Sequence, residues 1–292
     1  MINKLKNLFP SLSTYEVYNP TSKDHHWYTT EDGEIFSISK NDITKKDIEL
    51  LSIFLNPIEE DFPTQTEEEI MWFQRIFHPQ TEEQEDIHSF RFVYFEIEGE
   101  TIEPTIFKNA LEEIFSKRVP ILWNNKNEGI IIEVEGEELT DYSQIIDLLM
   151  SDLYINIKFY VGQTREDLTN IQKRYESVLT NGRLGVKLVK KAVFSYVDIL
   201  PHLMIRSVDH KIKEELIETV LKDFKDDKET LKMIETFLYC NLNISLTAKQ
   251  LYLHRNSLQY RIDKFIEQTN IDLREFHNAL TVYFALLALA DE

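Results

Sequence analysis

Residues 243–262 read NISLTAKQLYLHRNSLQYRI, and this stretch decides the architecture of the C-terminal part of the chain. Ser245 is a residue type that caps helix N-termini, so it predicts the start of a short first helix. Ala248 supplies the small side chain needed where two helices cross closely. Leu258 and Ile262, four residues apart, predict the buried side of a second helix. This pattern predicts a helix-turn-helix within residues 229–292.

The predicted second helix leaves polar side chains away from its core side or at the margin of that side. A recognition helix presents its N-terminal residues to base edges in the major groove. Arginine pairs bidentately with guanine, and asparagine or glutamine pairs with adenine. Serine, threonine, histidine and tyrosine are better suited to phosphates, which orient a protein without specifying sequence. The predicted DNA-binding residues are Ser245, Thr247, His254, Arg255, Asn256, Ser257, Gln259, Tyr260, Arg261 and Lys264.

The net charge of −19 is distributed unevenly along the chain. Residues 228–292 hold seven basic and eight acidic side chains, so nearly all of the excess negative charge lies upstream. Phosphate contacts need local lysine and arginine rather than a basic protein. An acidic remainder would repel DNA from other faces without preventing binding by the last domain.

Composition favours packed domains and excludes several other classes. Hydrophobic residues make up 42% of 292 residues and aromatic residues 12%, which is ample for two or three cores. The longest apolar stretch, at residues 285–290, is too short to span a bilayer, and the first residues lack the apolar run of a secretion signal. The one cysteine, Cys240, excludes an internal disulfide. We therefore expect a cytoplasmic protein with no membrane association.

The order of predicted elements gives the chain an α+β, multidomain fold class. From residue 89 the pattern is strand, helix, strand, strand, helix, strand, which is the ferredoxin-like arrangement. A further helix at 167–179 is expected to end before Asn181-Gly182. Upstream, strands at 15–18 and 35–38 and capping boxes at Thr44 and Thr66 predict an α/β block of unknown role. The predicted domains are 1–88 (α/β), 89–203 (ferredoxin-like), 204–228 (helical linker) and 229–292 (all-α helix-turn-helix).

The C-terminal string resembles the PucR/CdaR family of bacterial transcription regulators. Their pattern Ser-x-Thr-Ala, Leu, His-Arg-Asn-Thr/Ser-Leu-x-Tyr-Arg-Leu/Ile stands here from Ser245 to Ile262, and the likeness continues through 269–273 into a closing helix. The resemblance covers about a fifth of the chain. It implies a middle domain similar to the diguanylate-cyclase (GGDEF) fold but degenerate, because residues 124–129 read NNKNEG where the cyclases carry their glycine-acidic turn.

The sequence predicts no catalytic or metal-binding residues, and no cofactor is expected. Glu133 with Glu135, and Asp141 with Asp147, have the composition of acid/base pairs, but no nucleophile or metal signature accompanies them. Solvated carboxylates are the better interpretation. Cys240 lies among apolar residues and is expected to be buried and inert.

The leading hypothesis is a transcription regulator, not an enzyme, whose partners are double-stranded DNA, a second copy in a homodimer or higher oligomer, and a small-molecule effector. Two rivals stay open: a nucleotide-binding or degenerate cyclase-type enzyme, and an adaptor whose helical C-terminus binds protein. Bound nucleotide with turnover would favour the first rival. A folded chain that binds no DNA would favour the second.

Overall fold

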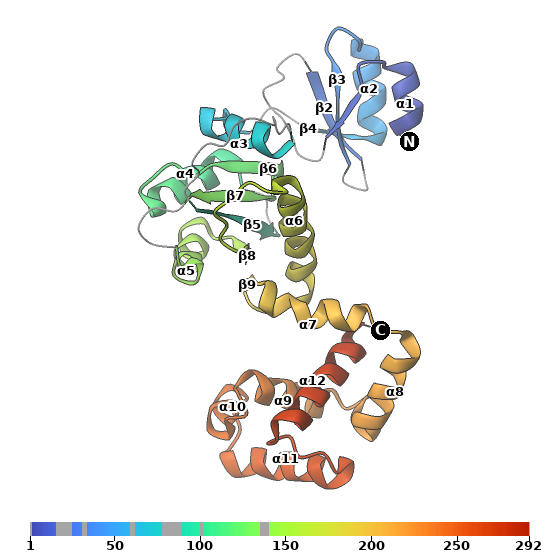
Figure 1. Cartoon of the computed structure of the whole chain (residues 1–292), viewed down its shortest axis with the longest axis vertical. Coiled ribbons are helices and arrows are strands. Elements are labelled where there is room, and N and C mark those ends of the chain that lie inside the picture. The colour runs from blue at the N-terminus through green and yellow to red at the C-terminus, as the bar shows by residue number, and fades with distance from the viewer. Residues whose placement is uncertain are drawn as a thin grey trace. The chain divides into compact units, whose positions relative to one another are not determined.

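The computed structural model describes residues 2–15, 25–30, 34–58, 62–77, 89–99, 102–134 and 140–291. The chain divides into two compact units, Met1–Tyr196 and Val197–Glu292 (Figure 1). Within the described residues, the strands lie in the N-terminal unit, and the C-terminal unit consists of helices. The predicted mixed α+β class is confirmed.

The N-terminal unit begins with an antiparallel sheet of four short strands in the order β1-β3-β2-β4. These strands are β1 (Ser13–Tyr15), β2 (His25–Thr29), β3 (Ile35–Ser39) and β4 (Asn56–Ile58). Helices α1 (Ile2–Leu8) and α2 (Lys45–Phe54) cover one face, over a core that includes Tyr28, Phe36 and Leu51. The capping box predicted at Thr44 begins α2. Residues 16–18 of the first predicted strand lie outside the described residues.

A five-stranded sheet forms the rest of the N-terminal unit, in the order β6-β7-β5-β8-β9. Its strands are β5 (Phe90–Glu98), β6 (Ile121–Asn125), β7 (Glu128–Val134), β8 (Asn156–Val161) and β9 (Val193–Ser195). Among the first four, each pair of neighbouring strands is antiparallel. These strands enclose α4 (Pro104–Phe115) and α5 (Tyr142–Leu153) in sequence, so the ferredoxin-like order is observed. β9 adds a parallel edge beside β8 that the sequence did not predict.

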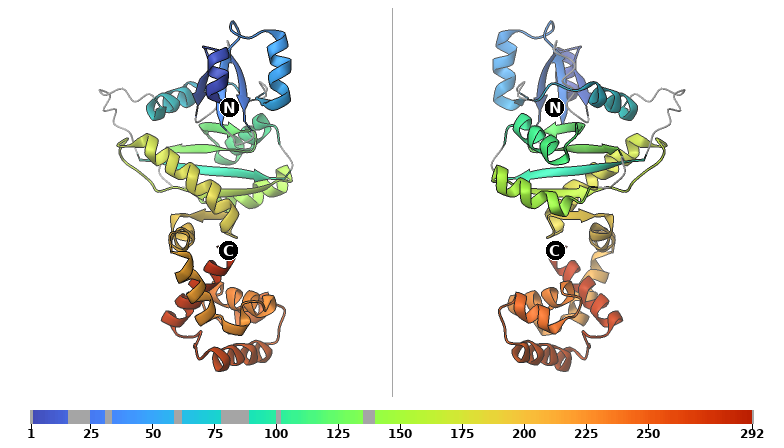
Figure 2. Two further views of the ribbon diagram at one scale, coloured as in Figure 1. Left: turned by 90° about the vertical axis from the view of Figure 1, so that its right-hand side faces the viewer. Right: turned by 90° about the vertical axis from the view of Figure 1, so that its left-hand side faces the viewer.

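Helices cover both faces of this sheet, so β5 is buried on both of its sides (Figure 2). Val93, Phe95 and Ile97 share a core with α4 and α5. On the other face, α3 (Glu67–Phe77) and α6 (Ile171–Leu188) meet the sheet through ring contacts, with centroids 5.1 Å apart for Trp72 and Phe90. α3 therefore packs on this sheet, although it precedes residue 89, where we expected the second domain to begin.

Helix α6 continues beyond Asn181-Gly182, so the end predicted there is wrong. The reason is packing: a Cβ atom on Gly182 would lie 2.3 Å from the ring of Tyr94. Gly185 has the same relation to Phe194, at 2.1 Å. Glycine here lets the helix approach the sheet closely and does not break it.

Charged side chains are buried in this unit, which corrects the expectation that Glu133 is solvated. Glu133 is 5% exposed and forms an ion pair of 2.7 Å with Arg91. Glu69, which begins α3 together with Thr66, forms a second buried pair of 2.7 Å with Lys108 and accepts the backbone N–H of Ile121. Asp141 caps α5, whereas Glu135 lies outside the described residues.

The C-terminal unit packs its helices around one core. They are α7 (Tyr196–Arg206), α8 (His210–Val220), the 3-10 turn η1 (Lys222–Phe224), α9 (Lys228–Tyr239), α10 (Ile244–Gln250), α11 (Arg255–Thr269) and α12 (Phe276–Asp291). No helix of the described chain has the length and apolar character needed to cross a membrane.

The segment expected as a linker, 204–228, contributes to this core. Ile217, Val220 and Phe224 are buried with residues of the last four helices, and α12 packs on α8. The apolar side chains of α12 are only partly buried: Phe276 is 70% exposed and Leu280 37%, whereas Val282 and Ala285 are fully buried. The small alanines let α12 pack closely on its neighbours.

Candidate nucleic-acid interface

Helix α10 begins two residues earlier than the sequence suggested. Its N-cap is Asn243, whose side chain accepts the backbone N–H of Leu246 at 3.0 Å. Ser245, predicted as the cap, is instead the second helical residue, and its side chain is exposed. Asparagine caps as well as serine does, so residue type alone did not separate the two positions.

The crossing of α10 and α11 is built as predicted, with one exception among the site residues. Ala248, Leu258 and Ile262 are buried, with exposed fractions of 4% or less. Thr247 is also fully buried, and its hydroxyl donates to the carbonyl oxygen of Asn243 at 2.8 Å. The prediction that Thr247 contacts phosphate is therefore wrong, because its hydroxyl is committed to the helix backbone.

The turn between the two helices places an aromatic side chain in solvent. Tyr252 has a φ of +54°, and its side chain is 97% exposed. The turn closes through the backbone N–H of Leu253, which donates to the carbonyl of Ala248 at 2.8 Å. Sequence reasoning missed Tyr252 as a candidate, since a tyrosine between two leucines gives no sign of full exposure.

The start of α11 presents the polar residues expected of a recognition helix. His254 is the N-cap but makes no capping bond through its side chain. The side chains of Arg255, Asn256 and Ser257 are exposed. In the described part of the chain these side chains form no hydrogen bond or ion pair. Their donors and acceptors are therefore free for a partner.

Further along α11, two of the predicted residues, Gln259 and Arg261, already have partners. Gln259 donates to Asp263 at 3.0 Å, and Arg261 forms an ion pair with Glu229 of α9. Tyr260 is 70% exposed. Tyr260, Arg261 and Lys264 border a groove of about 580 Å³ between α11 and the start of α9.

Acidic residues limit the surface that α11 offers to a polyanion. Asp263 and Glu267 are exposed, about one and two turns beyond Tyr260. The first two turns of α11 carry Arg255 and Arg261 and no acidic residue. The electrostatics therefore favour contact with DNA through the N-terminal half of this helix.

Cys240 is buried, as predicted, and joins α9 to α10. It is 4% exposed, and its thiol donates to Oε1 of Gln250 at 3.0 Å. The contact fixes the end of α9 against the first helix of the motif. Among the described residues, no cluster of three histidine, cysteine or acidic side chains is arranged to hold a metal.

Comparison with known proteins agrees with this geometry. The PucR C-terminal helix-turn-helix domain matches residues 230–288. The uncharacterized protein YxkF of Bacillus subtilis is 33% identical over 259 residues, which cover 86% of each chain. The proline-responsive transcriptional activator PutR of Bacillus subtilis is 37% identical over 68 residues, 23% of this chain and 16% of PutR. The carbohydrate diacid regulator of Escherichia coli is 41% identical over 46 residues, 16% of this chain and 12% of that protein.

The matches to PutR and the carbohydrate diacid regulator span less than a quarter of either partner. The signals in their names therefore belong to those proteins. The match to YxkF runs through both units. The motif at residues 243–262, its folded geometry and these relatives agree: the chain belongs to the PucR family of transcriptional regulators.

Proposed function

We propose that the N-terminal half of α11 reads DNA in the major groove and that the chain regulates genes in response to a metabolic signal. The observation that carries this proposal is that the side chains of Arg255, Asn256 and Ser257 are exposed and have no partner among the described residues. They stand directly before Leu258 and Ile262, whose full burial fixes the orientation of the helix. A regulator that binds chromosomal DNA works in the cytoplasm.

The proposed contacts fall into two groups. Arg255 and Asn256 read base edges, and Gln259 joins them once it leaves Asp263. Ser245, His254, Ser257, Tyr260 and Lys264 contact phosphate, and we add the exposed Tyr252 of the turn. Arg261 contacts DNA after exchanging Glu229 for a phosphate.

We propose that the protein acts as a homodimer or higher oligomer on two half-sites. One helix-turn-helix makes few contacts, and an acidic chain gains little from nonspecific attraction. Two-fold symmetry would place the recognition helices about 34 Å apart, or a multiple of that, along the duplex. Light scattering with and without operator DNA tests this. A strict monomer that binds one half-site as tightly as the full site would contradict it.

We propose further that the five-stranded domain is a degenerate relative of the cyclases without their activity. At the β6–β7 turn, the Asn125 side chain accepts the N–H groups of Asn127 and Glu128, at 2.8 and 3.1 Å. The Glu128 carboxylate is held by Arg183 and by the Tyr94 hydroxyl, 2.6 Å away, so it is poorly placed for a metal. Incubation with GTP and Mg²⁺ should yield no cyclic dinucleotide, and product above background would overturn this proposal.

Genomic footprinting of the full chain supplies a natural binding site, on which salt dependence is then measured. The affinity should fall steeply with salt, because each phosphate contact releases counterions. When the footprinting is repeated with the Arg255→Ala variant, protection of the preferred sites should be lost. A correctly folded Arg255→Ala variant with the wild-type footprint would show that α11 is not the recognition helix.

A further inference from the structure

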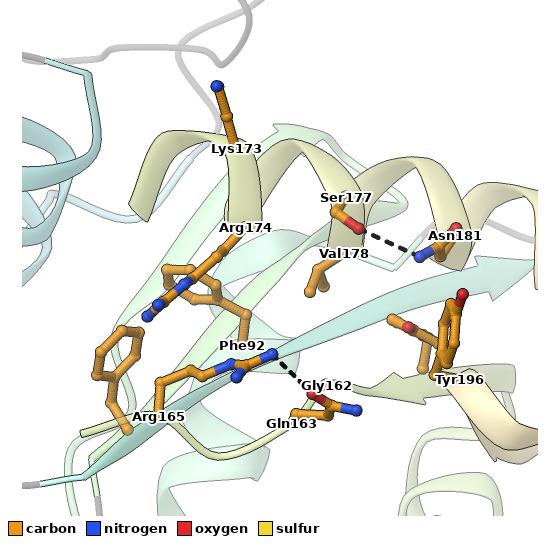
Figure 3. Close-up of a pocket in the computed structure, with 12 residues that line it drawn as sticks. Phe92, Gly162, Gln163, Arg165, Lys173, Arg174, Ser177, Val178, Asn181 and Tyr196 are labelled. Atoms are coloured by element: carbon orange, nitrogen blue, oxygen red, sulfur yellow. Dashed lines mark hydrogen bonds between the residues drawn. The ribbon is translucent and has the colours of Figure 1, made fainter. Parts of the chain in front are cut away.

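A cavity of about 360 Å³ lies between α6 and the strand ends of the five-stranded sheet. The loop after β8 contributes Gln163 and Arg165 to its wall, and α6 contributes Arg174, Ser177 and Asn181. Figure 3 shows the side chains of Arg165 and Arg174 extending into the space between these two segments, while Lys173 stands at the rim and points away from the strands. The volume is within the range of small-molecule sites.

The lining of this cavity is positively charged in a chain of net charge −19. Arg165, Lys173 and Arg174 border it, and none of the described lining residues is acidic. Arg174 is paired with Asp167 at 3.0 Å. Arg165 is exposed and donates only to the neutral Gln163, at 2.6 Å, and within the described residues neither it nor Lys173 has a carboxylate partner. Among the described residues, no carboxylate therefore neutralises the positive charges of Arg165 and Lys173.

Aromatic rings and neutral polar groups complete the cavity. Phe92 and Tyr160 form a buried floor. Asn181 donates to Ser177 at 3.3 Å and forms a side-chain hydrogen bond with Tyr160. Tyr196 stands at the opposite rim from the arginines with a ring that is 39% exposed (Figure 3). The cavity therefore has a cationic end next to Phe92 and an aromatic rim at Tyr196 (Figure 3).

Gly162 lets the end of β8 approach β5 closely. A Cβ atom there would lie 2.5 Å from the carbonyl oxygen of Phe92, to which the Gly162 N–H donates at 2.9 Å. A larger residue would force β8 away from β5 and displace the loop that carries Arg165. The close strand contact thus positions the cationic end relative to the rings.

We propose that this cavity binds a small organic oxyanion, a carboxylate or a phosphate monoester, that carries a planar ring. The oxyanion lies between Arg165 and Arg174, where guanidinium groups give charge-assisted hydrogen bonds. The ring lies along Phe92 and Tyr160 and against Tyr196. As an effector site this assignment rests on the proposed regulatory function, but binding itself is independent of DNA. Tyr196 is the last residue of the N-terminal unit and the first of α7, so the ligand contacts the segment that leads to the DNA-binding unit.

Four probes, measured by calorimetry and saturation-transfer NMR on the full chain, test the proposal. Phenyl phosphate and benzoate carry both charge and ring, inorganic phosphate has no ring, and benzyl alcohol has no charge. At least one ring-bearing anion should bind, and about tenfold more tightly than inorganic phosphate and benzyl alcohol. The tighter binder of these two ring-bearing probes shows whether the site prefers a phosphate or a carboxylate. No binding of either up to about 10 mM, or equal binding of inorganic phosphate, would overturn the proposal.

Matched variants locate the bound probe. Arg165→Gln should weaken binding about tenfold, the usual effect of losing a hydrogen bond to a charged group. Ser177→Trp fills the cavity and should abolish binding. Lys187→Gln and Thr180→Trp, exposed on the same helix but outside the cavity, should bind like wild type. Wild-type affinity in Arg165→Gln and Ser177→Trp would place the probe elsewhere and refute the site.

The same variants separate this inference from the proposed DNA-binding function. Ser177→Trp should retain operator binding in the absence of probe, whereas Arg255→Ala should retain probe binding and lose operator binding. Probe binding without DNA binding would refute only the proposed function. DNA binding without probe binding would refute only the cavity assignment.

Discussion

Two sets of charged side chains, one in each unit of the chain, have opposite environments. In the N-terminal unit, Lys108 and Arg91 are buried in pairs with Glu69 and Glu133, and each pair joins elements distant in sequence. In the C-terminal unit, Arg255 and its neighbours at the start of α11 are exposed and have no partner among the described residues. Polar groups that the chain satisfies internally hold the fold together, and those left unsatisfied at the surface are available to bind.

This contrast can be measured because the tryptophans report on only one of the two units. Trp27, Trp72 and Trp123 are the only tryptophans of the chain, and they are buried in the N-terminal unit. Tryptophan fluorescence therefore follows the unfolding of that unit alone. DNA binding follows the other unit, so the effect of each variant can be assigned to one unit or the other.

The largest expected effect is on stability, at Lys108. Lys108→Met keeps the apolar stem but leaves the buried Glu69 carboxylate without its counterion. Breaking one side of such a pair should lower the free energy of unfolding by about 3–5 kcal/mol. Urea denaturation followed by tryptophan fluorescence measures this change.

Lys187→Met is the matched control, because Lys187 is exposed on α6. Lys187→Met should leave the midpoint of urea denaturation unchanged. A Lys108→Met variant as stable as this control would show that the buried pair does not hold α3 to α4 and the sheet.

The next effect is on DNA binding, at Arg255. Arg255→Ala should weaken binding to the preferred site by about 1–3 kcal/mol and relax its sequence preference. Fluorescence anisotropy with labelled duplexes measures both changes, and the unfolding curve followed by far-UV circular dichroism, which includes the helical C-terminal unit, should stay at wild type. Arg274→Ala removes an exposed arginine already paired with Asp272, and it should bind DNA normally. Equal losses in the two variants would indicate a general charge effect without recognition by α11.

A smaller effect of opposite sign is expected at Glu229. This carboxylate is paired with Arg261 beside the proposed interface and would repel phosphate. Glu229→Gln should therefore raise affinity a few-fold, roughly the effect of one fewer repelling charge near the duplex. In Glu229→Gln/Arg261→Gln most of that gain should disappear. Weaker binding by Glu229→Gln would mean that Glu229 positions Arg261 for DNA.

The smallest effect is expected at the end of α12. Hydrogen bonds from Lys213 and then Arg206 hold the pKa of Asp291 below its ordinary value. Such a carboxyl stabilises the fold above the unfolded pKa of about 3.9, and the contribution is lost as pH falls through the lowered value. Asp291→Asn should cost roughly 0.2–1 kcal/mol at neutral pH and nothing in strong acid. Hydrogen exchange of α12 amides at pH 7 measures the cost, and unchanged protection would refute it.

The sequence predicted the helix-turn-helix well because its signals are local. The spacing of Ala248, Leu258 and Ile262 within fifteen residues sets both helices and their crossing, and all three are buried as expected. The ferredoxin-like order was predictable for the same reason, since each strand and helix has its own apolar pattern. β9 was missed because three residues are too few to show alternation.

The errors arose where a distant contact decides the outcome. Glycine at 182 indicates a break unless the Tyr94 ring opposite it is known. Glu133 looked solvated because its partner, Arg91, lies 42 residues away. Thr247 looked available because its bond to the Asn243 carbonyl depends on where α10 begins. Likewise, the cavity at Arg165 and Arg174 joins segments that sequence patterns cannot place side by side.

Selection of randomised duplexes by the purified full chain tests the central claim most directly. Wild-type protein should enrich a site of two half-sites whose centres are about 34 Å apart or a multiple of that. Asn256→Ala should lose preference at one position in each half-site, whereas Lys264→Gln should keep the same site with lower affinity and a weaker salt dependence. Enrichment of the same sequence by wild type and by both Asn256→Ala and Arg255→Ala would contradict base reading by the start of α11.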